Sequence, residues 1–93
     1  MALHFSWDRA KAAANFRKHA LSFAEGATAF GDPLSITIPD PDHSSREERF
    51  LLIGLTNRGR LAVVAHVERG DDIRIINARF PTRHERRTYE EDR

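Results

Sequence analysis

The sequence predicts a single α+β domain, with an antiparallel sheet packed against two N-terminal helices and one C-terminal helix. Two observations lead to this expectation. The 93 residues suit one domain, residues 1–93, and 40% hydrophobic with 31% charged residues is typical of a folded protein. Helix-favouring segments with capping residues come first, and strand-like alternation of apolar and polar residues follows.

The first third of the chain predicts a short strand and two helices. Apolar and polar residues alternate over residues 3–6, which suits a brief strand. Asp8 is a good N-cap for an alanine-rich helix over residues 8–18. Ser22 and Glu25 form a capping box, and the second helix that they begin ends at a Gly-Asp-Pro sequence.

The rest of the chain predicts four strands and a final helix. Residues 34–38 alternate as a strand does, and a polar, proline-rich loop follows. Three further strands, separated by turns, form a meander. Thr82 and Glu85 make a second capping box for a helix that runs through Tyr89. The three meander strands are Arg49 to Leu55, Arg60 to Val67 and Asp72 to Arg79, and the order of elements is βααββββα.

The two faces of the meander follow from its pairing. If Leu55 faces Arg60 and Val67 faces Asp72, alternation places one apolar set toward the N-terminal helices. This set is Phe50, Leu52, Leu61, Val63, Ala65, Val67, Ile76 and Ala78. On the other face Arg60 then lies opposite Arg79, and Arg49 lies opposite His66. Opposed arginines destabilise a sheet unless they spread into solvent, share a carboxylate such as Glu85 or bind an external anion.

Composition excludes several classes. There is no cysteine, hence no disulfide or thiolate zinc site, and no apolar run is long enough to span a membrane, so we expect a cytoplasmic protein. The histidines and acids lack metal-ligand spacing, and the Asp40, Asp42 and His43 cluster suits a polar turn better than a metal site. We therefore expect no metal and no cofactor. A net charge of +1 makes autonomous DNA binding a poor hypothesis.

The basic residues favour chemistry on a phosphodiester. Of 15 Lys and Arg residues only Lys11 and Lys18 are lysine, and arginine suits bidentate phosphate recognition, although a G and C rich genome has the same bias. RNA cleavage needs no metal when the 2′-hydroxyl is the nucleophile. His66 is our candidate acid or base, unless it is a hydrogen-bonded strand histidine. Tyr89 either stacks on a base or anchors the last helix.

A series of spaced motifs covers the chain almost from end to end. It resembles the BrnT family of type II toxins, in the same order along the sequence. The motifs are Phe5-Ser6-Trp7-Asp8, Lys11-Ala12, Asn15, Lys18-His19, Ser22-Phe23, Asp32-Pro33, Glu48-Arg49, Gly54, Gly59-Arg60, Val63-Val64, Glu68-Arg69, Arg74 to Arg79, Glu85-Arg86-Arg87 and Tyr89-Glu90.

The resemblance implies a RelE-like fold and a bacterial ribonuclease that arrests translation and is neutralised by a small antitoxin, BrnA. BrnA carries a DNA-binding region, so DNA is a partner only through the antitoxin, with which we expect a heterotetramer. We expect Arg60, His66 and Arg79 to be catalytic. Residues that contact RNA are expected to be Lys11, His19, Arg49, Arg69 and Tyr89.

The rival hypothesis is an inactive toxin that serves as a binding partner of a DNA-binding antitoxin. The apolar middle of the arginine-bearing face suits a protein partner as well as RNA. Three departures from the family pattern are visible. Ala20 replaces the usual Gly after His19 and is expected to strain the helix junction, Asn77 replaces Ser, and Phe80-Pro81 replaces a basic-small pair.

Overall fold

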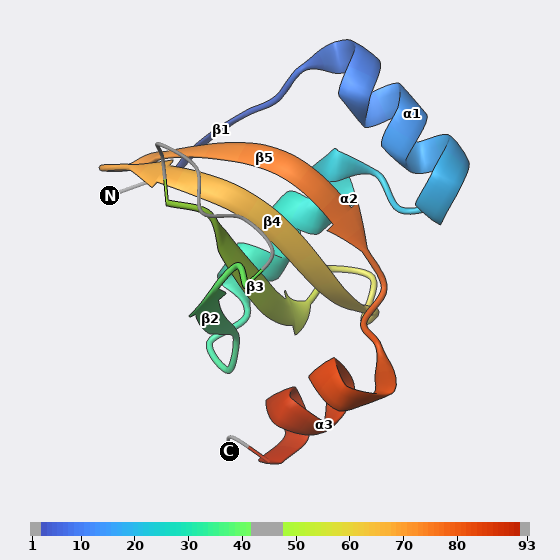
Figure 1. Cartoon of the computed structure of the whole chain (residues 1–93), viewed down its shortest axis with the longest axis vertical. Helices are drawn as coiled ribbons and strands as arrows, with labels where there is room; N and C mark the ends of the chain where they lie inside the picture. The colour runs from blue at the N-terminus through green and yellow to red at the C-terminus, as the bar shows by residue number, and fades with distance from the viewer. Residues whose placement is uncertain (1–2, 42–47, 92–93) are drawn as a thin grey trace.

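The computed structural model describes residues 3–41 and 48–91, and within them it has one five-stranded sheet and three α-helices (Figure 1). The predicted order of elements is confirmed. In chain order the elements are β1 (His4–Ser6), α1 (Arg9–His19), α2 (Phe23–Thr28), a 3-10 turn η1 (Ala29–Gly31), β2 (Ile36–Pro39), β3 (Phe50–Leu55), β4 (Leu61–Arg69), β5 (Asp72–Arg79) and α3 (Arg83–Glu91).

The sheet has the strand order β1-β5-β4-β3-β2. Strands β2 to β5 pair antiparallel, as expected, but β1 pairs parallel with β5 along residues 4–6 and 72–74. A parallel neighbour needs a long crossover, and here the whole of the chain from α1 to β4 lies between the two strands. Since β1 is only three residues long, no strand within residues 3–41 and 48–91 pairs with the second half of β5 on that side.

Apolar side chains form one cluster on each face of the sheet. On the face toward α1 and α2, Leu21 and Phe23 pack with Val64 and Ile75, and partly buried rings of Phe5, Trp7 and Phe30 extend the cluster. On the other face, Ile53 and Val63 pack with Tyr89, the one buried residue of α3. Figure 1 shows α3 at the opposite end of the molecule from α1. None of the helices in the described ranges is both long and apolar enough to cross a membrane.

The predicted pairing of the meander is wrong. Leu55 lies opposite Leu61, because the Thr56 N–H donates to the Arg60 carbonyl at 2.8 Å and only three residues, with Gly59 at φ 75°, form the turn. Arg69, not Val67, lies opposite Asp72, since the second turn has only two residues. A β-bulge between Ala65 and His66 then shifts the register once more, as an extra residue in one strand does.

The corrected register exchanges the faces of β4. Ala62, Val64 and His66 face the N-terminal helices, and Leu61, Val63 and Ala65 face α3, which is the reverse of the prediction. Val63 lies opposite Arg79, and Phe50 lies opposite His66. The predicted Arg60–Arg79 and Arg49–His66 oppositions therefore do not exist.

Candidate functional site

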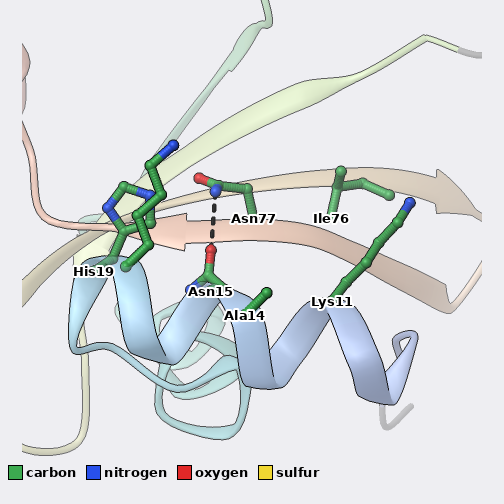
Figure 2. A pocket seen from close by; sticks show the side chains of 7 residues that line it. Lys11, Ala14, Asn15, His19, Ile76 and Asn77 are labelled. Atoms are coloured by element: carbon green, nitrogen blue, oxygen red, sulfur yellow. Dashed lines mark hydrogen bonds between the residues drawn. The ribbon is translucent and has the colours of Figure 1, made fainter.

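Helix α1 carries a row of polar side chains along the edge of β5. The helix begins after Asp8, whose carboxylate accepts from the Lys11 N–H at 2.9 Å, and ends at Ala20, which has φ 57° and ψ 30°. Residues three or four positions apart lie on one side of a helix. Asn15 comes four residues after Lys11, and Lys18 and His19 come three and four residues after Asn15. Figure 2 shows Lys11, Asn15 and His19 pointing toward β5.

Asn15 joins this helix to the open part of β5. It is buried, and its Nδ2 donates to the Leu21 and Ala78 carbonyls at 3.0 and 2.8 Å. Its Oδ1 accepts from Asn77 Nδ2 at 2.9 Å and from the Ala78 N–H at 3.2 Å. The side chain of Asn15 thus replaces a neighbouring strand where β1 has ended, and it fixes the distance between α1 and β5.

Two adjoining hollows lie along this junction, and we call them together the α1–β5 groove. The first, of about 230 Å³, is drawn in Figure 2. The second, of about 400 Å³, extends over the sheet face on which α3 also packs, and the two share Lys11, Ile76 and Asn77. The first hollow is also lined by Ala14, Asn15, Lys18 and His19, and the second by Asp40, Arg49, Leu51, Ala65 and Arg79.

The groove concentrates positive charge. Four of its lining side chains are cations, Lys11, Lys18, Arg49 and Arg79, and one is a carboxylate, Asp40. The whole chain has a net charge of only +1. Cations gathered in a concave surface raise the local concentration of anionic ligands far more than the same charges spread over a protein.

Arg79 is held in place by the first turn of α3. Its Nη1 and Nη2 donate to the two carboxylate oxygens of Glu85 at 2.7 and 2.8 Å, and the Arg79 side chain is 29% exposed. The Thr82 N–H also donates to Glu85, as the predicted capping box requires. The hydrogen bonds from Arg79 are the main cause that lowers the pKa of Glu85 to about 2. Arg79 is thus a preoriented cation at one end of the groove.

Arg60, a predicted catalytic residue, lies outside the groove. Its Nε donates to Glu25 Oε2 at 2.9 Å, its Nη2 donates to Oε1, and Thr56 donates to the same carboxylate. These contacts, with the Arg60 hydrogen bonds as the largest cause, lower the pKa of Glu25 and raise that of Arg60. Arg60 therefore stabilises a buried carboxylate of α2, and the guanidinium also lies over the ring of Phe80 at 5.2 Å.

His66, the predicted acid or base, is fully buried on the sheet face that packs against α1 and α2. Its ring packs edge-on against Phe30, with centroids 4.8 Å apart, and beside Phe50. Nδ1 lies 3.0 Å from the Val64 carbonyl and Nε2 lies 2.9 Å from Glu68 Oε2. The expectation that Arg60, His66 and Arg79 share one open face is therefore wrong, because the corrected register puts His66 and Arg79 on opposite faces.

The predicted RNA-contacting residues divide into two groups. Lys11, His19 and Arg49 line the groove, as a shared role requires. Arg69 lies opposite Asp72 where β4 ends, and it lines neither hollow. Tyr89 is 3% exposed and donates its hydroxyl to Asp32 at 2.6 Å, so it anchors α3 and has no open ring face for stacking.

Sequence reasoning missed four polar residues that line the groove, Asn15, Lys18, Asp40 and Asn77. The spacing from Lys11 to Lys18, two helical turns, is a signal that could have identified Lys18. Asp40 is buried and follows β2, but no signal in the neighbouring sequence predicts that it lies near Arg49 or Lys11. In the two described ranges no three His, Cys, Asp or Glu side chains are grouped as a metal ion would need.

Two comparisons with known proteins found a match, one to a family of sequences and one to a solved structure. The sequence profile of a family described as "Ribonuclease toxin, BrnT, of type II toxin-antitoxin system" matches residues 7–85. The fold is similar to the 1.1 Å crystal structure of the Brucella abortus ribonuclease toxin BrnT, with a TM-score of 0.62 and 21% sequence identity over 88% of this chain and 100% of that one. No curated protein matches the chain in sequence.

Proposed function

Because the chain belongs to the BrnT family of ribonuclease toxins of type II toxin-antitoxin systems, we propose that the α1–β5 groove is where it binds and cleaves RNA. The observation that carries this proposal is the gathering of Lys11, Lys18, Arg49 and Arg79 in one concave surface. An RNA strand is a chain of phosphates, and such a groove can follow its backbone.

In this proposal Arg49 and Arg79 bind the phosphate that is cut, and Lys11 binds a neighbouring phosphate. Fixed cations that face the developing charge of a phosphorane-like transition state lower the barrier without reorganisation. The Glu85 carboxylate keeps the Arg79 fork in one orientation through two hydrogen bonds. Removing one such cation is expected to slow cleavage by about 10²-fold.

The reaction needs a base and an acid but no metal ion. The 2′-oxygen attacks the adjacent phosphorus and gives its proton to the base, and the 5′-oxygen leaves with a proton from the acid. The products are a 2′,3′-cyclic phosphate and a 5′-hydroxyl. Asp40 and His19 line the groove and can transfer protons, so we assign them these two roles in place of His66.

The first experiment is cleavage of a labelled RNA by the purified protein, with and without EDTA. We expect wild type to cut in EDTA, and Arg79→Ala and Arg49→Ala to cut about 10²-fold more slowly. Arg87→Ala removes an exposed arginine of α3 outside the groove, and it should cut like wild type. Equal rates for all three variants would exclude the groove as the site, and loss of cutting in EDTA would exclude the metal-free step.

A type II toxin has a cognate protein antitoxin. We propose a BrnA-like antitoxin that blocks the groove, binds DNA for the complex and forms a heterotetramer with this chain in the cytoplasm. Light scattering of the copurified pair measures the stoichiometry. A complex that cuts RNA as fast as the free toxin would contradict neutralisation at the groove.

A further inference from the structure

Asn77 has one half of its amide fixed and the other half directed at the groove. It lies at the point where the two hollows meet and lines both of them. Its Nδ2 donates one hydrogen to Asn15 Oδ1 at 2.9 Å. Figure 2 shows its carbonyl oxygen pointing away from Asn15. Within the described residues, no protein group hydrogen-bonds to that oxygen or takes the second N–H.

The orientation of this amide is determined by Asn15. Both N–H groups of Asn15 are given to backbone carbonyls, and its oxygen accepts from the Ala78 N–H as well as from Asn77. Turning the Asn15 amide over would place its oxygen against two carbonyl oxygens and its nitrogen against a backbone N–H, which is unfavourable. Asn15 therefore presents its oxygen as an acceptor to Asn77, and Asn77 must donate through its Nδ2.

We propose that Asn77 is a specificity-determining residue that recognises an adenine of the bound RNA, with Asn15 as its positioning residue. This inference rests on the proposed function of the groove. The exposed part of the amide offers one acceptor beside one donor. A base in single-stranded RNA can be read along its Watson–Crick or Hoogsteen edge. On the Watson–Crick edge every base has a donor beside an acceptor, but on the Hoogsteen edge only adenine does, with N6 beside N7. Asparagine pairs with adenine through these two atoms.

The surrounding charges suit such a contact. Lys11 lies on one side of Asn77 and His19 on the other in Figure 2, and Lys18 lines the same hollow. The cations of this hollow, Lys11 and Lys18, can hold the sugar-phosphate backbone but do not distinguish bases. The neutral, oriented amide of Asn77 is the group that can.

The test is to sequence the cleavage sites that the purified protein makes in an RNA pool with randomised positions. Wild type is expected to show adenine at one fixed position from the cut, with at least about 10-fold preference over the other bases. Asn77→Ser keeps a hydroxyl donor near Asn15 but removes the amide edge, so it should cut with little base preference at that position. Asn57→Ser, in the β3–β4 turn outside the groove, is the matched control and should keep the preference.

A second measurement needs no variant of the protein. In a defined substrate, purine riboside replaces the preferred adenosine and removes the N6 amine. Wild type should cut this substrate at least about 10-fold more slowly. Cleavage without adenine preference, or an unchanged preference in Asn77→Ser, would overturn this inference and leave the proposed function standing. If wild type cuts no RNA at all, both fall together.

Discussion

Replacing Glu85 by glutamine is expected to lower the free energy of unfolding at pH 7 by about 3 kcal/mol. The Arg79 hydrogen bonds and the capping contacts of Thr82 bring the pKa of Glu85 from 4.5 to about 2. One pKa unit corresponds to about 1.36 kcal/mol, so the ionised carboxylate favours the folded state by about 3 kcal/mol. Glutamine has the same shape and still accepts the Thr82 N–H, and it therefore removes mainly the charge.

The contribution of Glu85 depends on pH in a defined direction. Because its pKa is lower in the folded state than in the unfolded state, the stabilisation is fully present above pH 4.5. It is lost as the pH falls from 4.5 through about 2. Wild type should thus lose more stability over this interval than Glu85→Gln, which has no carboxylate to protonate at this position.

Urea unfolding followed by circular dichroism at pH 7, and at steps down to about pH 3, measures both effects. Glu90→Gln is the control, since Glu90 is an exposed acid on the same helix. Its free energy of unfolding should stay within about 0.5 kcal/mol of wild type, as is usual for surface substitutions. If Glu85→Gln unfolds at the wild-type midpoint at pH 7, or if both proteins lose equal stability on acidification, the ion pair does not stabilise α3 as argued.

Three further substitutions test the fold around the groove. Ala20→Gly should raise the free energy of unfolding by about 1 kcal/mol, because Ala20 has φ 57°, a left-handed conformation that glycine adopts without strain. A lower midpoint in urea would contradict the presence of strain at Ala20. Arg60→Ala should lower the free energy of unfolding by leaving the Glu25 carboxylate without its bidentate partner, whereas an unchanged midpoint in urea would show that water replaces the guanidinium. Tyr89→Phe should cost about 2 kcal/mol through the lost hydrogen bond to Asp32, measured by thermal unfolding, and an unchanged midpoint would contradict that contact.

The capping residues and the apolar patterns predicted each α-helix and strand of the described chain, but not the 3-10 turn η1 that follows α2. Asp8, Ser22 and Thr82 each precede the helix that they were expected to begin. Such signals work because a cap or an alternating run acts within a few residues of itself. The family resemblance added the RelE-like fold and the ribonuclease class, and the family comparison bears both out.

The register could not be obtained in the same way. A shift of one residue in the first turn exchanges the faces of β4 and yet keeps its local alternation. The bulge at Ala65 and His66 changes which residues of β5 lie opposite them, so that Ile75 and Ala78 share one face. His66 was therefore expected on an open surface and lies in the core. The register of lowest free energy depends on how side chains pack on both faces of the sheet, and no short stretch of sequence contains that information.

The sequence by itself determined the α+β fold class, the richness in arginine and the motifs of a toxin family. Only the tertiary structure decided which cations share a surface. Lys11 and Arg79 meet at one groove because Asn15 bonds to residues 62 and 63 positions away. Arg60 lies outside the groove, where it binds Glu25, 35 positions away. Contacts at such separations arise only when the whole chain folds together, since each depends on the burial and hydrogen bonding of its surroundings.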